Sequence, residues 1–445
     1  MIRKDRVRQL EDRLAGRSLI YFGTRGTDAR PLLELGALSE VFCQVAPLQA
    51  AGVSETCLEI MTRRRVDLNS YSIDQDSSEP VRALRAGMLK AFSRPAAIVP
   101  YRPTALVASA WFPRSDRVQY LGMFHEHQAC FEHKPWVETQ LSDAGVRILP
   151  WSYYSDDDLI LIREAAERDA LVLRANRSDG GAGLTLIRTP SDLQHNWPSH
   201  EDGFLAAARF LTPSIPLNIN ACVFAGGEVS IHAASVQLIG ISACTNRTFG
   251  YCGNDFAQFQ ELGSTVINAL DRMVRTVGAW LARKGYLGAF GIDALLHEDK
   301  VYLAELNPRF QGSSRISAEL DAEVDRPDIF LNHIAAFMRL TPPPLTPLSE
   351  LTRSLPPYAH IVCHNLLPTS ASCTPTNLDT LPLHCSLVPA VNVAVEPEGI
   401  LADCLLNRKI TNDGTSLLPS VESQLRATLQ QLYSTEYSGL TSSVP

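Results

Sequence analysis

The stretch Gly288–Ser314, GAFGIDALLHEDKVYLAELNPRFQGSS, decides how we interpret this chain of 445 residues. It contains two segments with strand composition, Leu287–Leu296 and Val301–Leu306, which predict the two arms of a hairpin. Asn307-Pro308-Arg309 follows the second arm directly. We therefore expect an antiparallel hairpin whose second strand ends in a polar segment.

Oxygen-bearing side chains gather in this hairpin. Glu305 and Asn307 are two residues apart, so both point to the same face of an extended strand. Asp293 joins that face if residue 293 pairs with 305, 295 with 303 and 297 with 301, leaving a three-residue loop at 298–300. A two-residue loop would turn Asp293 away. Carboxylates and an amide carbonyl on one face suit Mg²⁺, and the alternative is a solvated polar sheet face. Arg309 adds a planar fork of donors suited to a phosphate or carboxylate.

A glycine-rich segment, Asn176–Gly183 (NRSDGGAG), lies between two strand-like stretches. Its glycines would let backbone N–H groups approach an anion, although a plain hairpin turn is the alternative. It is not a Walker A loop, because G-x-x-x-x-G-K-[ST] is absent and the order is strand, loop, strand. Arg174, on the strand leading in, and Lys134, at the start of a predicted helix, could reach phosphates or could be surface charges.

Composition excludes several classes of protein. Lys and Arg number 40 against 48 Asp and Glu, a net charge of −8, so no basic surface suits a nucleic acid. Ten cysteines show no C-x-x-C and no zinc spacing, which predicts buried free thiols. The charged N-terminus has no apolar signal region, and no apolar run is long enough to span a membrane. We expect a cytoplasmic protein with neither nucleic-acid nor membrane partners.

Changes in hydrophobic period predict four regions. Residues 1–120 begin an open α/β layer with a strand at Ser18–Gly23, a loop at 24–30 and a helix at 31–39. The loop after such a strand faces a ligand crevice, so Arg25 and Asp28 either contact substrate or form a surface turn. Regions 121–200 and 201–338 hold the glycine-rich segment and the hairpin, with helices at 133–144 and 264–284. A proline-rich linker at 341–350 precedes a small α+β module at 351–445.

Together these segments resemble the ATP-grasp carboxylate–amine ligases. HKPWVETQLSDAGVRILP is similar to the helix with the first ATP-contacting lysine, and ALVLRANRSDGGAGL to the strand and flexible glycine loop of that family. The sequence from 288 to 314 resembles the metal-binding hairpin and the N-P-R-x-x-G-S signature, and it is the most specific match. The resemblance covers about residues 120–335. YFGTRGTDARPLL and the four-region layout look closest to ligases that join amino acids or peptides in natural-product biosynthesis.

The resemblance implies an α/β (overall α+β) ATP-grasp fold. Its parts would be a pre-ATP-grasp domain (1–120), a small subdomain (121–200), a large subdomain (201–338) and the C-terminal module (351–445). It implies an ADP-forming ligase that uses ATP and Mg²⁺. A small-molecule carboxylate would form an acyl phosphate, which an amine would then attack to give an amide or peptide bond. Similar proteins also lead us to expect a homodimer.

The resemblance assigns roles to individual residues. Asp293, Glu305 and Asn307 would bind Mg²⁺, while Arg309 and Ser313 would act at the reacting groups. The implied ATP contacts are Lys134, Arg174, Ser178, Gly180, Gly181, Ala182, Gly183, Arg209, Phe210, Leu211 and Asn218. The candidate substrate contacts are Arg25, Asp28, Asn254, Ser314 and Arg315. Two departures from the family stand out: Arg174 replaces a lysine, and Asn218 replaces the acid that grips the ribose hydroxyls.

Two other functions stay open from the sequence. One is a biotin-carboxylase-like carboxylase that uses bicarbonate as its carboxylate. The other is a nucleotide-binding regulatory module without turnover, against which the joint presence of Asp293, Glu305, Asn307 and Arg309 argues.

Overall fold

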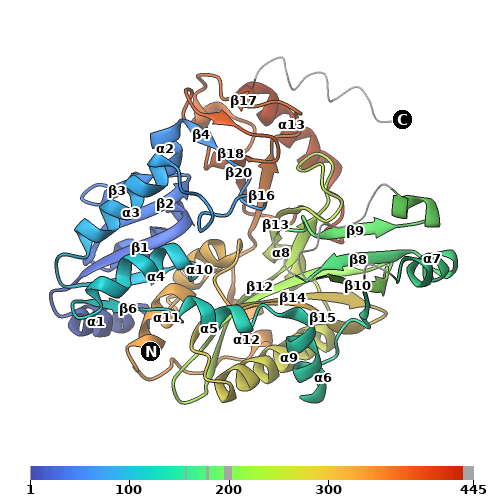
Figure 1. Cartoon of the computed structure of the whole chain (residues 1–445), viewed down its shortest axis with the longest axis horizontal. Coiled ribbons are helices and arrows are strands. Elements are labelled where there is room, and N and C mark those ends of the chain that lie inside the picture. Colours follow the sequence, from blue (N-terminus) through green and yellow to red (C-terminus); the bar gives the residue numbers. More distant parts are fainter. Residues whose placement is uncertain (1, 156–157, 177–179, 195–202, 434–445) are drawn as a thin grey trace.

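A computed structural model describes residues 2–155, 158–176, 180–194 and 203–433, which form four sheets with flanking helices (Figure 1). Among these residues, no helix has the length and apolar character needed to cross a membrane. The predicted ATP contact Ser178 lies outside the described residues.

The N-terminal sheet has five parallel strands in the order β3-β2-β1-β5-β6. Its strands are β1 (Ser18–Arg25), β2 (Leu38–Val45), β3 (Ser54–Cys57), β5 (Ala96–Pro100) and β6 (Val118–Tyr120). The helices of this region are α1 (Arg3–Leu14), α2 (Leu58–Thr62), α3 (Glu79–Ala91) and α4 (Ala105–Trp111). The open α/β layer is therefore confirmed.

The predicted helix at 31–39 is wrong. A 3₁₀ helix covers Gly26–Glu34, and residues 38–39 already belong to β2. Pro31 has no N–H for an α-helical hydrogen bond, and Leu38 pairs with Leu19 of β1. Strand pairing thus overrides the helical spacing of the apolar residues.

The second sheet is antiparallel and has four strands in the order β7-β10-β8-β9. Its strands are β7 (Ser152–Ser155), β8 (Leu171–Ala175), β9 (Leu184–Ile187) and β10 (Phe204–Arg209). The helices beside it are α5 (His125–Cys130), α6 (Lys134–Asp143) and α7 (Leu159–Arg168). This confirms the strands around the glycine-rich segment and the helix that begins with Lys134.

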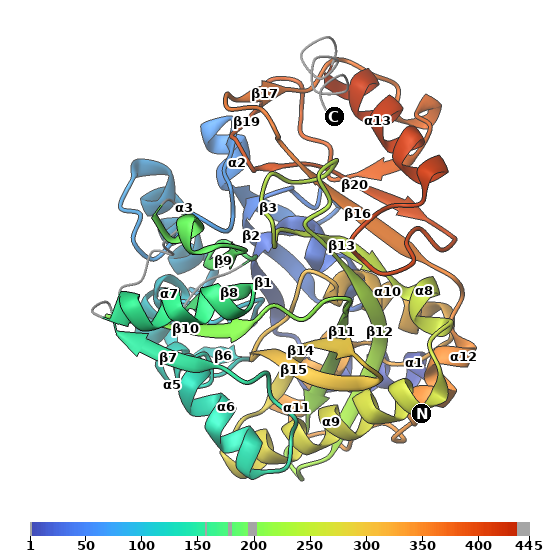
Figure 2. The same cartoon turned by 90° about the vertical axis from the view of Figure 1, so that its right-hand side faces the viewer.

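The largest sheet has eight strands in the order β15-β14-β11-β12-β13-β16-β20-β18. Its strands are β11 (Ile215–Val223), β12 (Val229–Ile239), β13 (Tyr251–Asp255), β14 (Gly288–His297), β15 (Lys300–Asn307), β16 (Ala359–His364), β18 (His384–Ser386) and β20 (Ile400–Leu406). The remaining helices are α8 (Phe256–Gln260), α9 (Ser264–Arg283), α10 (Ser314–Glu323), α11 (Ile329–Phe337), α12 (Leu348–Ser354) and α13 (Pro419–Tyr433). Helix α9 runs along β11 and β15 (Figure 2) and buries the apolar stripe seen in its sequence.

The C-terminal region shares this sheet. Strand β16 pairs with β13, and β20 and β18 extend the sheet beyond it. A further sheet of short strands joins β4 (Arg64–Arg65), from the N-terminal region, to β19 (Ala394–Val395) and β17 (Ala371–Ser372). The four-region division remains a proposal, but the described residues from 351 to 433 are tied to two other regions by backbone hydrogen bonds.

The β14–β15 hairpin has a different register from the predicted one. Asp293 does pair with Glu305, but Ala294 then pairs with Leu303, and His297 with Lys300. The loop is therefore the two residues Glu298 and Asp299, both with positive φ as a tight type I′ turn requires. The expected pairs 295–303 and 297–301 and the three-residue loop are wrong. An extra residue, Ala304, forms a bulge that returns Asp293 to the face of Glu305.

Candidate active site

A cavity of about 860 Å³ lies where the three larger sheets meet. The N-terminal sheet contributes Arg25, the four-stranded sheet contributes Arg174, and the eight-stranded sheet contributes Asp293 and Glu305. Lys134, Arg309 and Ser313 line the same cavity. Residues predicted from four separate stretches of the chain therefore line one cavity.

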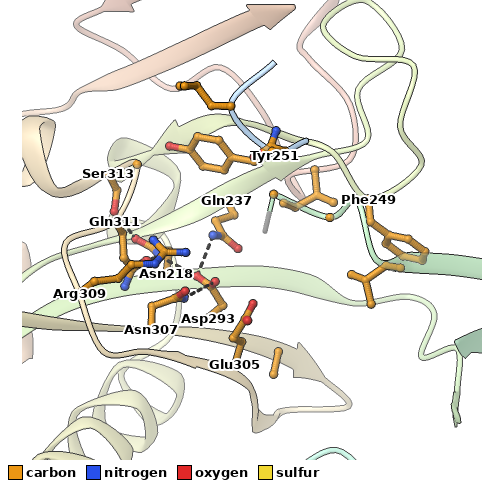
Figure 3. A pocket seen from close by; sticks show the side chains of 18 of the residues that line it. Asn218, Gln237, Phe249, Tyr251, Asp293, Glu305, Asn307, Arg309, Gln311 and Ser313 are labelled. Atoms are coloured by element: carbon orange, nitrogen blue, oxygen red, sulfur yellow. Dashed lines mark hydrogen bonds between the residues drawn. The ribbon is translucent and has the colours of Figure 1, made fainter. Parts of the chain in front are cut away.

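Asp293 is the centre of a hydrogen-bonded cluster at the floor of the cavity (Figure 3). Its Oδ2 accepts from Asn307 Nδ2 at 2.9 Å. Its Oδ1 accepts from Asn218 Nδ2 at 2.7 Å and from Gln237 Nε2 at 2.8 Å. Burial and the nearby Glu305 carboxylate raise the pKa of Asp293 to about 6.

The donor set fits Mg²⁺. Asp293 and Glu305 are two carboxylates on one face, and their mutual repulsion in a buried setting favours a bound cation. No group of three or more His, Cys, Asp or Glu is arranged to hold a metal within the described ranges. Mg²⁺ suits this sparse set, because it binds through one or two carboxylates and takes its other oxygens from phosphates and water.

The signature segment 307–314 is anchored from beneath. Gln311 receives a hydrogen bond from Asn218 Nδ2 and donates from Nε2 to the Ile219 carbonyl at 3.3 Å. Ser313 Oγ donates to Asn218 Oδ1 at 2.6 Å. Gly291 makes room for this arrangement, since a Cβ there would lie 0.9 Å from Gln311 Nε2. Asn218 therefore contacts Asp293 and Ser313. This position does not favour the predicted contact between Asn218 and the ribose.

The cations predicted for phosphate contact face the cavity. Lys134 Nζ lies 2.9 Å from Glu305 Oε1. Arg174 is buried, donates from Nη1 to Glu138 at 2.6 Å and stacks 4.0 Å above the Trp151 ring. Its Nε and Nη2 are buried without a hydrogen-bond partner among the described residues. Such donors are costly to leave unpaired, so Arg174 is suited to a ligand with acceptor oxygens.

Part of the glycine-rich segment closes over the cavity. Gly180 and Gly181 line it, both with positive φ. A Cβ on Gly180 would lie 2.1 Å from Asn69 Oδ1, and one on Gly181 would lie 2.0 Å from the Phe249 carbonyl oxygen. Ala182 and Gly183 lead into β9, and the Gly183 carbonyl accepts from Ala175 N at 2.9 Å. Only glycine allows so close an approach to two other parts of the chain.

The last residue of β10, Arg209, and the two residues after it, Phe210 and Leu211, also border the cavity. The Arg209 guanidinium pairs with Asp169 at 3.2 Å and is largely exposed. Its backbone therefore offers the more suitable contacts to a ligand, as the resemblance implies for adenine.

Of the candidate substrate contacts, Arg25 lines the cavity and donates to Asp28 Oδ2 at 3.0 Å and to the Gly312 carbonyl at 3.2 Å. The other four are buried behind the described wall: Asp28, Asn254, Ser314 and Arg315. Each of them makes at least one hydrogen bond to another protein group, so the geometry does not favour direct contact between these four residues and a substrate.

Sequence reasoning missed several lining residues. Gln237 and Tyr251 lie on β12 and β13, 56 and 42 residues before Asp293 in the chain, and no local spacing connects them to it. Gln311 lies inside the signature quoted above and could have been singled out as a polar residue between Arg309 and Ser313. For Trp151 and Phe249, nothing in the sequence beyond their apolar character predicted that they line the cavity.

Comparison with known proteins gives one domain family and several structures with a similar fold. The model of the ATP-grasp domain family matches residues 139–313. No curated protein sequence matches the chain. A biotin carboxylase from Campylobacter jejuni, in complex with β-γ-ATP, is 14% identical, with 93% of this chain and 91% of that chain covered and a TM-score of 0.61. An N5-carboxyaminoimidazole synthetase from Staphylococcus aureus, complexed with ADP, is 14% identical over 93% and 97% of the two chains, with a TM-score of 0.57.

A third similar structure is the biotin carboxylase domain of 2-oxoglutarate carboxylase from Hydrogenobacter thermophilus, which contains MgADP, ADP and bicarbonate. It is 12% identical over 93% and 90% of the chains, with a TM-score of 0.59.

This chain therefore carries an ATP-grasp domain and has the fold of the ATP-grasp enzymes. The predicted fold class is confirmed, and the match over residues 139–313 supports the predicted family. The ATP-grasp domain match and the similar structures, one of which contains MgADP, support the predictions of an ATP-dependent ligase or carboxylase that uses ATP and Mg²⁺.

Proposed function

We propose that this protein is an ADP-forming ligase that joins a carboxylate to an amine through an acyl phosphate. The observation that carries the proposal is the convergence of Lys134, Arg309, Asp293 and Glu305 on a cavity that continues past them to Arg25. Cations and metal-binding carboxylates at one end suit a triphosphate. The space beyond them suits the molecules to be joined.

In this proposal Asp293, Glu305 and Asn307 hold Mg²⁺, which would neutralise the phosphate charge as ADP leaves. Asn218 and Gln237 fix the orientation of Asp293 through its Oδ1. Lys134 and Arg174 contact the triphosphate, with Gly180 and Gly181 above it. Catalysis is then mainly positioning and charge neutralisation by groups already in place.

Arg309 is assigned to the transferred phosphoryl group and Ser313 to the acceptor side. The closing contacts of Gly180 and Gly181 support exclusion of water, without which an acyl phosphate would hydrolyse. Asp28, Ser314 and Arg315 support Arg25 and the signature segment from behind the wall.

Charged side chains in the cavity wall favour amino acids or peptides as substrates. Arg25 offers a positive charge, and Glu398, which accepts from Thr245 Oγ1 at 2.8 Å, offers a negative one. Opposite charges in the wall of one cavity suit a zwitterion. We extend the proposal to ligation of amino acids or peptides in natural-product biosynthesis, while a homodimer and a cytoplasmic location remain predictions.

The second candidate function is a carboxylase that activates bicarbonate. The similarity in fold to biotin carboxylases favours it. Against it stands the extent of the cavity, which continues to C-terminal residues such as His364 and Ile400, more space than bicarbonate needs.

One experiment separates these functions. The protein is incubated with Mg²⁺ and ATP, with each pair of the twenty proteinogenic amino acids or with bicarbonate, and both phosphate and products are measured by mass spectrometry. The proposal predicts phosphate release that requires amino acids and yields a dipeptide or amide mass. Release with bicarbonate and no amide would support the carboxylase, and no release at all would support a regulatory module.

A further inference from the structure

Tyr251, on β13, presents its hydroxyl to the cavity beside the signature segment (Figure 3). Its ring lies on Gly312, where an added Cβ would be 3.0 Å from Cε1 and 3.2 Å from Oη of the tyrosine. Gly312 lies between Arg309 and Ser313 in the sequence. The phenol is therefore placed next to the residues that we assign to the acyl phosphate and the acceptor.

A buried series of polar side chains leads away from this hydroxyl. His360 Nε2, on β16, lies 3.3 Å from Tyr251 Oη. His360 Nδ1 lies 3.0 Å from Asp403 Oδ1, on β20, and both residues are 0% exposed. Hydroxyl, imidazole and carboxylate thus follow one another across three neighbouring strands of the sheet.

The carboxylate at the end of this series, Asp403, is held in its charged form. Asp403 Oδ2 accepts from Arg315 Nη2 at 2.7 Å. His360, Arg315 and Arg25 keep the pKa of Asp403 below its usual value despite complete burial. A fixed anion against Nδ1 favours the proton on that nitrogen, so that Nε2 of the neutral imidazole is the acceptor. The other neighbour of Nε2 is Asn254 Oδ1 at 3.1 Å, the oxygen that receives the tyrosine hydroxyl hydrogen.

The hydroxyl has two directions in which to donate. Tyr251 O–H donates to Asn254 Oδ1, whose Nδ2 donates to Ser235 Oγ at 2.8 Å. Rotation of the hydroxyl hydrogen would redirect it to His360 Nε2. The alternative interpretation is that this network only ties three strands together, but a structural network needs no hydroxyl in the wall of the cavity.

Amide formation requires a route for a proton. An α-amino group is largely protonated at pH 7, so it must lose a proton before it can attack a carbonyl carbon. Asp293 already accepts three amide hydrogen bonds, and Glu305 pairs with Lys134. These carboxylates are committed to the phosphate end of the cavity.

We propose that Tyr251 is the catalytic proton shuttle for the acceptor amine and that His360 and Asp403 position and receive the proton; this rests on the proposed ligase function. Before attack, the ammonium group gives one proton to Tyr251 Oη. The original Tyr251 proton passes to His360 Nε2, and Asp403 stabilises the imidazolium. The freed nitrogen lone pair then forms the N–C bond at the acyl carbon. The C–O bond to phosphate breaks, and phosphate leaves with the electron pair and takes the second amine proton. His360 later returns its proton to solvent through Tyr251.

The test compares two acceptors. Full-length protein with Mg²⁺ and ATP receives each of the twenty proteinogenic amino acids as carboxylate, with either hydroxylamine or an amino acid as acceptor. Hydroxylamine is largely unprotonated at pH 7 and needs no base before it attacks. We expect Tyr251→Phe to reduce amide formation about 100-fold or more while hydroxamate formation changes little. Raising the pH from 7 to 9 should recover part of the amide formation.

Charged and titratable groups on the neighbouring elements influence the protonation of this network. They are Arg25, Tyr101, Asp293, Arg315 and Asp403. His360→Gln should show the same split between acceptors and replaces Tyr251→Phe if that variant fails to fold. Tyr120→Phe is the matched control, since its buried hydroxyl lacks a partner among the described residues and lies outside the cavity wall.

Equal losses with both acceptors, or no loss with either, would overturn the shuttle. Wild-type protein that forms hydroxamate but responds to neither variant would leave the proposed function intact and reject this inference alone. Wild-type protein that forms neither product would reject the ligase itself.

Discussion

Asp293 and Glu305 lie directly opposite each other on β14 and β15, although the turn between their strands contains two residues. A regular ladder from that turn would pair Asp293 with residue 304 and put Glu305 on the opposite face. The bulge at Ala304 adds the missing residue and brings the two carboxylates together. The metal-binding face therefore depends on an irregularity in the ladder.

Loss of one of these carboxylates should abolish turnover. We expect Glu305→Ala to lower ATP-dependent phosphate release by at least about 100-fold, because Mg²⁺ loses a ligand and Lys134 loses its partner. The measurement is phosphate release at saturating Mg²⁺. Glu164→Ala, on the exposed surface of α7, is the control and should match the wild type. Similar activity in both variants would contradict the metal assignment.

A conservative substitution tests whether the planar guanidinium of Arg309 makes two contacts at once. Arg309→Lys keeps the charge but loses the two-pronged geometry, so we expect kcat to fall about 10-fold to 100-fold with a smaller change in KM for ATP. Steady-state kinetics measure both. Arg209→Lys, whose exposed side chain pairs with Asp169, should have little effect. A near-normal kcat for Arg309→Lys would show that the fork is not used.

Glycine at position 291 should be indispensable to the cluster. A methyl group there would overlap Gln311, which would have to leave Asn218 and the Ile219 carbonyl. We expect Gly291→Ala to reduce the free energy of unfolding by about 1–3 kcal/mol and to impair turnover. Gly263→Ala is the control, because nothing lies within 4 Å of an added Cβ there. Chemical denaturation of both variants would show whether the predicted difference exists.

Stability should depend on pH through His333. Its Nδ1 accepts from Ala289 N at 3.0 Å, its Nε2 lies 2.8 Å from the Leu121 carbonyl, and burial lowers its pKa to about 4. Below pH 6.5 the unfolded chain gains a proton that the folded chain does not. The free energy of unfolding should therefore fall between pH 6.5 and 4, by about 3 kcal/mol from this residue.

Urea unfolding at a series of pH values, compared between wild type and His333→Gln, isolates that contribution. The difference between the two proteins should change across this range and level off below about pH 4. A constant difference would mean that His333 titrates alike in both states.

The sequence predicted the strands well but not how they combine. The composition of 287–306 identifies two strands, yet a bulge such as Ala304 leaves no mark in an alternating pattern. Gln237 and Asn218 reach Asp293 from β12 and β11 through pairing across long stretches of chain, which no local spacing encodes. For the same reason the sharing of one sheet by β13 and β16 could not be foreseen.

Polar residues in the site were predicted where a motif contained them. Asp293, Glu305, Asn307 and Arg309 fall in one stretch, so their shared face could be argued from strand geometry. Asn254 and Arg315 were predicted as substrate contacts, but whether they face the cavity or lie behind its wall depends on packing, which the sequence does not reveal.

The transfer of oxygen from carboxylate to phosphate tests the central claim most directly. A carboxylate substrate found in the amino-acid screen is labelled with ¹⁸O in its carboxyl group and incubated with Mg²⁺, ATP and the amine. An acyl phosphate intermediate predicts that each inorganic phosphate released carries one ¹⁸O atom from the carboxylate. Phosphate that carries only solvent or ATP oxygen would contradict the ligase mechanism.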